Sequence, residues 1–288
     1  MERGIASFTY SDFTLEYAIT GEGEPVLYLH GGHSNCLEQL GIEELAQNGY
    51  SVIVPSRAGY GQTSRQIGKS LEKACSFYIE LLNELNIDKV HLIAASTGGP
   101  SGIYLASHYP ERVQSFTLQG AVTKPWQEAS VRDAVLSRFL FHPFIERFVW
   151  RSLSSLARFS PDYAFKKIAP AYSTLSYEEI KQRMLARDWY LFDRMTEFQR
   201  SGHGFYIDLQ HMRQSLEEEL ETITAPTLIV HSKNDAIVPL EHAHYAHERI
   251  RSSKLVCLDT WGHLVCLGKG SEQHTHELAD FLQQHKAS

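Results

Sequence analysis

The chain has 288 residues, of which 43% are hydrophobic, and its formal net charge is −7. This length and apolar content suit one large α/β domain, with or without an insert. Because no basic cluster is present, we expect no nucleic-acid partner. No stretch is long and apolar enough to span a bilayer, and the first residues lack the apolar core of a signal peptide, so we expect no membrane contact. The four cysteines show no metal or redox spacing, which favours a reducing, cytoplasmic setting.

Short apolar runs alternate with helical patterns through the first 120 residues. The expected strands cover Ser7–Tyr10, Thr14–Ile19, Val26–His30, Ser51–Pro55, Val90–Ala94 and Val113–Leu118. The expected helices cover Leu37–Asn48, Ser70–Leu85 and Pro100–Tyr109. Short apolar runs are typical of strands buried on both faces, and strands that alternate with helices pair in parallel through right-handed crossovers.

The alternation stops between about Ala121 and Glu221. Ser176 and Glu179 have the spacing of a capping box, which predicts a helix that runs to about Arg200. A structureless loop of this size is implausible, so we predict a helical insert. Its aromatic side chains suggest an apolar pocket. They are Trp126, Phe139, Phe141, Phe144, Phe148, Trp150, Phe159, Tyr163, Phe165, Tyr172, Tyr177, Trp189, Tyr190 and Phe192.

The alternation resumes in the last third of the chain. Expected strands cover Pro226–His231 and Lys254–Leu258, and expected helices cover Leu240–Arg249 and Glu272–Gln284. The prediction is an α/β fold: a mostly parallel sheet of about eight strands flanked by helices, with a helical cap inserted after the sixth strand. The core would comprise residues 1–120 and 222–288, and the cap residues 121–221.

Ser96 lies between an expected strand and an expected helix, in the stretch KVHLIAASTGG. A serine in a sharp strand-to-helix turn is typical of the nucleophile elbow, G-x-S-x-G. Small residues are needed two positions before and after the serine, because the strand end packs hard against the next helix. Gly98 meets this demand, and Ala94 meets it with one extra methyl group.

A candidate acid and a candidate base follow two later strands. Asp235 lies in the loop after PTLIVH, and His263 lies in the loop after KLVCL. The chain order Ser96, Asp235, His263 is the order expected for this kind of elbow. The histidine would take the serine proton, and the carboxylate would orient the histidine and stabilise its charged form. Asp259, in the loop of His263 itself, is the alternative acid.

The glycines after the third expected strand suit an oxyanion hole. The N–H of Gly32 can approach the serine closely, and with the N–H of Thr97 it would supply two donors. We expect His30 to brace this loop and His33 to contact the substrate.

Other reactive side chains have a simpler interpretation. His242, His244 and His247 cannot all converge on a metal, because residues two apart on a helix point to different sides, so we expect a solvated face and no metal. Cys36 and Cys266 lack a visible base partner, so we expect buried thiols.

These segments together resemble the α/β-hydrolase superfamily, in the capped branch with small esterases, cofactor-free haloperoxidases and proline iminopeptidases. The resemblance covers nearly the whole chain outside the insert. It rests on HGG at His30–Gly32, PSRAGYGQTS at Pro55–Ser64, ASTGGP at Ala95–Pro100, the Asp235 loop with Pro239, and Gly262-His263.

Several positions depart from the family pattern. Ala94 stands where the elbow usually has glycine, and Ser56 stands where aspartate is common before Arg57. HGGHS and Thr97 replace the HGGPG and tryptophan of iminopeptidases, which weighs against a peptidase. Ser96 contradicts an aspartate nucleophile, as in epoxide hydrolases and dehalogenases.

The resemblance implies a hydrolase that cleaves small or medium carboxylic esters of a small-molecule acyl substrate through an acyl-enzyme, without a cofactor. The alternatives are a C–C bond hydrolase or an amidase or aminopeptidase with the same triad, and a slow-turnover ligand-binding signalling protein. The oligomeric state stays open, with a homodimer as one option.

Overall fold

An eight-stranded sheet forms the centre of the part of the chain that the computed structural model describes, residues 4–126 and 138–286. Its order is β1-β2-β4-β3-β5-β6-β7-β8. The first two strands form an antiparallel hairpin, β2 also pairs antiparallel with β4, and all other neighbours are parallel. The strands are β1 Gly4–Tyr10, β2 Phe13–Thr20, β3 Glu24–Leu29, β4 Tyr50–Pro55, β5 Val90–Ala95, β6 Val113–Gln119, β7 Thr227–Ser232 and β8 Ser253–Leu258. The predicted fold class is confirmed.

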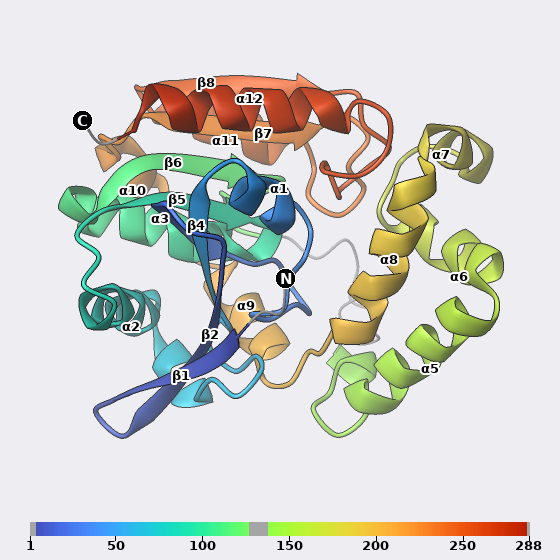
Figure 1. Cartoon of the computed structure of the whole chain (residues 1–288), viewed down its shortest axis with the longest axis horizontal. Helices are drawn as coiled ribbons and strands as arrows, with labels where there is room; N and C mark the ends of the chain where they lie inside the picture. Colours follow the sequence, from blue (N-terminus) through green and yellow to red (C-terminus); the bar gives the residue numbers. More distant parts are fainter. Residues whose placement is uncertain (1–3, 127–137, 287–288) are drawn as a thin grey trace.

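Helices cover both faces of this sheet (Figure 1). One apolar cluster joins the strands to α1 and α12, and a second joins them to α2, α3, α10 and α11. Side chains alternate between the clusters along β3: Val26 and Tyr28 belong to one, Leu27 and Leu29 to the other. These helices are α1 Ile42–Gln47, α2 Leu71–Glu84, α3 Gly99–His108, α10 Glu217–Thr222, α11 Glu241–Arg249 and α12 Ser271–Gln284.

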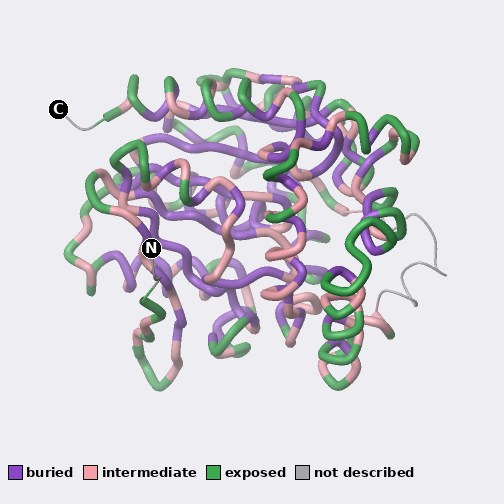
Figure 2. Tube along the Cα trace, turned by 45° about the vertical axis from the view of Figure 1, so that its right-hand side comes forward, coloured by how far each residue is buried: buried purple, intermediate pink, exposed green. Residues whose placement is uncertain are grey.

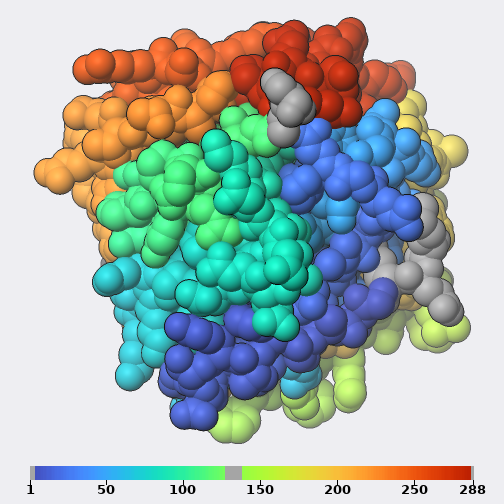
Figure 3. Space-filling model, turned by 60° about the vertical axis from the view of Figure 1, so that its left-hand side comes forward, coloured from blue at the N-terminus to red at the C-terminus, as the bar shows by residue number. Residues whose placement is uncertain are grey.

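Burial follows this layering. The strands are mostly buried, whereas the helices expose their outer faces (Figure 2). The N-terminal hairpin and the C-terminal helix lie along opposite borders of the molecule (Figure 3), as expected from the positions of β1 and β8 at opposite edges of the sheet. No helix of the described residues is long and apolar enough to cross a membrane.

A group of helices lies between β6 and β7 in the chain, as the sequence predicts for the cap. Four of them, α5 to α8, gather beside the sheet at the right of Figure 1, and α9 leads back to the core. They are α5 Glu146–Phe159, α6 Pro161–Ile168, α7 Tyr177–Arg183, α8 Ala186–Phe198 and α9 Gly204–His211. We call the segment from residue 121 to 221, apart from α10, which packs on the sheet, the cap.

The cap has one break that the sequence pattern does not reveal. The Ser176–Glu179 capping box is present, but the single helix predicted to about Arg200 is wrong, because α7 ends at Arg183. Met184 and Leu185 are extended, with ψ of 137° and 160°. The Asp188 carboxylate accepts the Leu185 N–H at 2.7 Å and starts α8 anew.

The predicted helix Leu37–Asn48 is also too long, since α1 begins at Ile42. The Glu38 carboxylate accepts the N–H groups of Gln39 and Leu40, which competes with helical pairing. Gly41 then takes a left-handed conformation, with φ of 77°, that only glycine adopts without strain.

Candidate active site

Ser96 projects from a sharp turn between β5 and α3. Its φ is 51°, a left-handed value that is uncommon for a residue with a side chain. The turn is tight, because a Cβ added at Gly98 would lie 2.5 Å from the carbonyl oxygen of Leu29. Strained backbone of this kind is concentrated at functional sites. The strand, turn and helix are those expected for a nucleophile elbow.

Ala94, the departure from the elbow pattern, is accommodated by a glycine on α3. A Cβ added at Gly102 would lie 2.5 Å from the Ala94 Cβ. The alanine methyl therefore occupies space that a side chain at position 102 would otherwise fill. A glycine at position 102 therefore makes room for the alanine at position 94.

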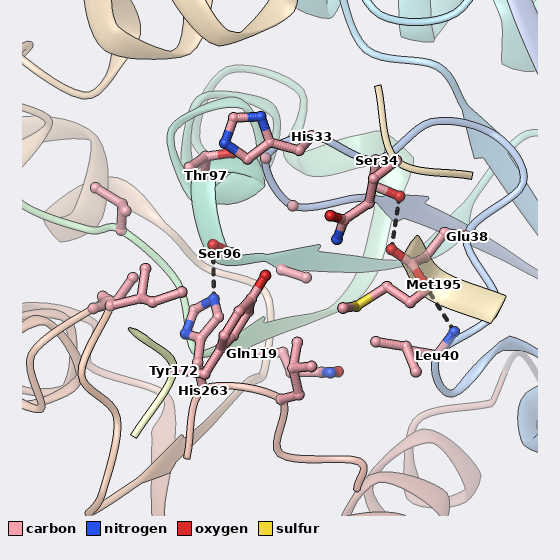
Figure 4. A pocket seen from close by; sticks show the side chains of 18 of the residues that line it. His33, Ser34, Glu38, Leu40, Ser96, Thr97, Gln119, Tyr172, Met195 and His263 are labelled. Atoms are coloured by element: carbon pink, nitrogen blue, oxygen red, sulfur yellow. Dashed lines mark hydrogen bonds between the residues drawn. The ribbon is translucent and has the colours of Figure 1, made fainter. Parts of the chain in front are cut away.

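Three side chains from separate loops form a hydrogen-bonded chain at the carboxyl ends of the strands. His263 Nε2 lies 3.0 Å from Ser96 Oγ, and His263 Nδ1 lies 2.7 Å from Asp235 Oδ2 (Figure 4 shows the first contact). The structure thus brings together the three residues that the sequence singled out. All three are buried.

The Asp235 carboxylate is held in its charged form. Burial alone would raise its pKa, but the pKa is lowered well below the usual range by His263 and His231. Its second oxygen accepts the N–H groups of Ile237 and Val238 at 2.8 and 2.9 Å. These contacts fix the plane of the carboxylate that faces His263.

His231 is a neighbour of the acid that the sequence analysis did not single out. Its Nε2 lies 2.8 Å from the Val238 carbonyl oxygen and 3.3 Å from Asp235 Oδ2. A signal was present, since His231 lies near the end of β7, the strand that precedes the acid loop. We interpret it as a brace for that loop.

Asp259, the alternative acid, points elsewhere. Its side chain is 67% exposed and bonds Arg183 and Asn234 at 2.7 and 2.9 Å. The Nδ1 atom of His263 already has Asp235 as its partner.

The two expected oxyanion donors border the same cavity as Ser96. The N–H of Thr97 belongs to the peptide group whose oxygen, on Ser96, accepts the Val122 N–H at 2.9 Å. Because the peptide group is planar and trans, this bond also fixes the direction of the Thr97 N–H. The Gly31–Gly32 loop packs closely on the serine, since a Cβ added at Gly31 would lie 3.1 Å from the Ser96 Cβ.

A cavity of about 390 Å³ lies above the serine, and its lining is mainly apolar. The core contributes residues on either side of Ser96, among them Tyr28, Ser34, Glu38, Leu40, Gln119, Leu264 and Cys266. Across from Ser96 and His263, Ser34 donates to Glu38 at 2.7 Å (Figure 4). The cap contributes Val122, Trp126, Tyr172, Met195, Gln199, Phe205, Leu209 and Met212.

The expectation that the aromatic residues of the insert line the pocket is only partly right. Of those named above, Trp126 and Tyr172 reach the cavity, and Phe205 joins them. Others, such as Phe165 and Phe192, pack in a cluster with Trp261 that attaches the cap to the core. A further group is exposed: Phe139, Phe144, Phe148, Phe159, Tyr163 and Tyr190.

His33 lines the cavity but is already engaged. Its Nδ1 lies 2.8 Å from Ser201 Oγ, and its ring lies among those of Phe141, Trp150 and Phe205. Burial lowers its pKa to about 4, so the ring is neutral at pH 7. The structure places it as an uncharged wall of the cavity.

The remaining histidines and cysteines do not form a site in the part of the chain that the structure describes. The expected solvated face is wrong for His242, which is buried and accepts the Thr123 N–H at 3.0 Å, while His244 and His247 are exposed. No cluster of described residues could hold a metal ion. Burial raises the thiol pKa of Cys36 to about 12 and that of Cys266 well above its usual range, so both are neutral thiols.

A short cap segment is bonded to both loops that carry the acid and the base. The Tyr172 carbonyl oxygen accepts the N–H of His263 at 2.9 Å and that of Ala236 at 3.4 Å. A Cβ added at Gly262 would lie 2.4 Å from this oxygen, which explains the glycine before the histidine. Sequence patterns do not reveal this contact, because a main-chain oxygen accepts a hydrogen bond whatever the residue type.

The family of the chain follows from comparison with known proteins. The sequence profile of the alpha/beta hydrolase fold matches residues 24–269. An uncharacterized hydrolase of Bacillus subtilis, YcgS, is 47% identical over 98% of this chain and all of its own length. A 2-hydroxy-6-oxo-6-phenylhexa-2,4-dienoate hydrolase of Comamonas testosteroni is 25% identical over 97% of this chain and 95% of its own.

Solved structures agree with this placement. An alpha/beta hydrolase fold protein from Nakamurella multipartita superposes with a TM-score of 0.83 at 25% identity. The superposition covers 97% of this chain and 99% of the other. The chain therefore belongs to the alpha/beta hydrolase fold family.

Proposed function

We propose that this protein is a serine hydrolase that cleaves small or medium carboxylic esters through an acyl-enzyme. The observation that carries the proposal is the chain of contacts from Ser96 Oγ to His263 Nε2 and from His263 Nδ1 to Asp235 Oδ2, at 3.0 and 2.7 Å. Both distances are within hydrogen-bond reach. This is the arrangement in which a neutral imidazole can activate a hydroxyl group.

In the proposed reaction, Ser96 Oγ attacks the ester carbonyl while its proton passes to His263 Nε2. The backbone N–H groups of Gly32 and Thr97 stabilise the oxyanion of the tetrahedral intermediate. His263 then gives the proton to the departing alcohol. A water, activated by the same histidine, releases the acid and restores Ser96. Asp235 keeps the Nδ1 proton of His263 in place and stabilises the imidazolium.

The lining of the cavity supports an uncharged acyl group as the substrate. No lysine or arginine is found among the described residues that border the cavity, whereas Glu38 is one of them. Burying a carboxylate beside an acidic group without a cation is costly. A neutral ester avoids that cost, and the apolar cap residues would gain by covering its acyl chain.

A C–C bond hydrolase is the second candidate, because relatives at 25% and 27% identity carry the name 2-hydroxy-6-oxo-6-phenylhexa-2,4-dienoate hydrolase. Such a dienoate bears a carboxylate, so the composition of this cavity favours the ester. An amidase or aminopeptidase with the same triad is a third candidate. A receptor that forms a single covalent adduct with its ligand is a fourth. Within the proposal the protein works in the cytoplasm, which its four free cysteines support.

The test is turnover of p-nitrophenyl esters from acetate to decanoate, beside a 2-hydroxy-6-oxo-dienoate and an amide of matched acyl group. We expect continuous turnover of esters and little cleavage of the dienoate. Faster cleavage of the dienoate would replace the proposal with C–C hydrolysis. A single stoichiometric release of nitrophenol without turnover would favour the receptor.

A further inference from the structure

A buried carboxylate of the cap lies behind the oxyanion side of the site. Asp208, on α9, is 1% exposed. Its oxygens accept from Arg57 at 2.5 and 2.8 Å, from Tyr60 Oη at 2.7 Å and from Thr97 Oγ1 at 2.8 Å. Arg57, Tyr60 and Thr97 all belong to the core, so one cap side chain joins three core side chains.

Arg57 connects Asp208 to the Gly31–Gly32 loop through further hydrogen bonds. Its Nε donates to the His30 carbonyl oxygen at 2.7 Å, and its Nη2 donates to the Gly31 carbonyl oxygen at 3.3 Å. The same Nη2 lies 2.8 Å from Thr97 Oγ1. The guanidinium therefore contacts both segments that would supply oxyanion donors.

The Gly31 oxygen matters because of the peptide group to which it belongs. The peptide group that carries this oxygen also carries the Gly32 N–H, on the opposite side. Arg57 Nη2 and His30 Nδ1, which lies 2.7 Å away, both hold the oxygen. They thereby fix the direction of the proposed donor.

His30 is a neutral part of this network. Burial, with Arg57 nearby, lowers its pKa to about 3. Its Nε2 accepts a hydrogen bond from the backbone N–H of Arg57 at 3.0 Å. The ring proton is therefore on Nδ1, which donates to the Gly31 carbonyl oxygen. This network thus gives a geometric basis for the expectation that His30 braces the loop.

We propose that Asp208 is a positioning residue of the oxyanion hole, acting through Arg57 on the Gly32 N–H and directly on Thr97. The proposal rests on the proposed function. Fork-to-fork pairing with a carboxylate fixes both the plane and the place of a guanidinium. Without the Asp208 carboxylate, Arg57 would remain buried and charged, and its guanidinium would shift to form hydrogen bonds with other acceptors. Full alignment of the donors therefore requires that α9 be seated on the core.

Such a role differs from ordinary support of the cap, and Asp188 provides the matched control. Asp188 is a second fully buried carboxylate of the cap, and it also bonds the core, accepting the Gly268 N–H at 3.0 Å. It has no place in the lining of the cavity. Asp208→Asn and Asp188→Asn therefore make the same chemical change at two links between cap and core.

The experiment compares the two variants with the wild type on p-nitrophenyl butyrate, at a temperature where each is folded by circular dichroism. For Asp208→Asn we expect kcat to fall by about 10- to 100-fold with KM changed little, since a small misplacement of donors affects the transition state most. Inhibition by a trifluoromethyl ketone should weaken by a similar factor, because Ser96 adds to its carbonyl carbon and the former ketone oxygen becomes an oxyanion that needs the same donors. Asp188→Asn should lower Tm and leave both readouts within about twofold of the wild type.

A second variant covers the case in which Asp208→Asn does not fold. Thr97→Val keeps the shape of the side chain and removes its contacts to Arg57 and Asp208. We expect a decrease in kcat of about 3- to 30-fold, with a parallel loss of ketone inhibition. Unchanged kcat and ketone inhibition in the folded variants would overturn the positioning role. If the wild type neither turned over esters nor bound the ketone, the proposed function would fail, and this inference with it.

Discussion

The loops at the carboxyl ends of the strands and the cap above them contribute differently to the site. The strand-end loops carry the groups proposed to react: Ser96, Asp235 and His263. The cap carries none of these, but its main chain at Tyr172 bonds the acid and base loops, and its Asp208 bonds the oxyanion side. In this chain the groups proposed to react belong to the core, whereas the hydrogen bonds that hold their loops in place come partly from the inserted segment.

The largest expected effect within this comparison concerns the acid. Asp235→Asn keeps the shape of the side chain but disturbs the proton arrangement at His263 Nδ1, now 2.7 Å from a carboxylate oxygen. We expect kcat for ester hydrolysis to fall on the order of 10⁴-fold. The measurement is steady-state kinetics with p-nitrophenyl butyrate.

Asp259→Asn is the control for that change. This carboxylate is largely exposed and pairs with Arg183, a contact of small energetic value. We expect activity within about twofold of the wild type. If Asp259→Asn were the damaging substitution and Asp235→Asn harmless, the acid would have been assigned to the wrong loop.

How much of this comparison was predictable depends on the kind of signal. The strands, the Ser96 turn and the loops of Asp235 and His263 are local patterns, because each is written in a few consecutive residues. The break between α7 and α8 is not, because it depends on the Asp188 side chain bonding the backbone at Leu185. The start of α1 was missed for a similar reason at Glu38.

The cap contacts were beyond the reach of sequence patterns for a different reason. Asp208 and Arg57 are 151 positions apart, and neither belongs to a periodic pattern with the other. Arg57 does lie in the PSRAGYGQTS segment, so a hint of its importance was present, but its partner had none. The inner and outer faces of the cap were likewise indistinguishable by aromatic content alone.

A smaller effect on substrate preference should distinguish the inner face of the cap, which borders the cavity, from its exposed outer face. Each added CH₂ of an acyl chain gains about 0.8 kcal/mol on burial, so kcat/KM should rise roughly three- to fourfold per methylene until the cavity is full. Phe205→Ala removes a ring that lines the cavity and so enlarges the cavity, which should move the plateau in kcat/KM to longer esters. The measurement is kcat/KM from acetate to decanoate.

Phe144→Ala is its matched control, because this ring is 83% exposed. It should leave the profile unchanged. A profile that is flat with chain length in the wild type, or equally altered by both substitutions, would contradict the assignment of the inner face. A rise without a plateau would indicate an open groove instead of a closed cavity.

The smallest effect concerns stability of the core rather than activity. His274, on α12, is buried, and neither ring nitrogen has a hydrogen-bond partner in the described part of the structure. Burial lowers its pKa to about 4, against about 6.5 in the unfolded chain. Between these values the unfolded state binds a proton that the folded state does not, so stability falls as pH decreases from about 6.5 to about 4.

His274→Leu should remove this pH dependence. At pH 5 it should recover about 2 kcal/mol of unfolding free energy from this linkage, and almost none at pH 7.5. Urea unfolding at the two pH values measures it, with exposed His276→Leu on the same helix as the control. An equal change at both pH values would show that packing, not protonation, decides the outcome. Ester turnover should be unaffected, since His274 does not border the cavity.

The most direct test of the central claim is to detect the acyl-enzyme. The reaction with p-nitrophenyl butyrate is quenched with acid, and the masses of the protein and of its proteolytic peptides are measured by mass spectrometry. The proposed acyl-enzyme predicts a butyryl adduct on the peptide that contains Ser96, formed and lost at rates consistent with kcat. The Ser96→Ala protein should fold normally, carry no adduct and lose at least about 10⁴-fold in kcat. Turnover of the ester by a folded Ser96→Ala protein, or an adduct on another residue with Ser96 unmodified, would contradict the account.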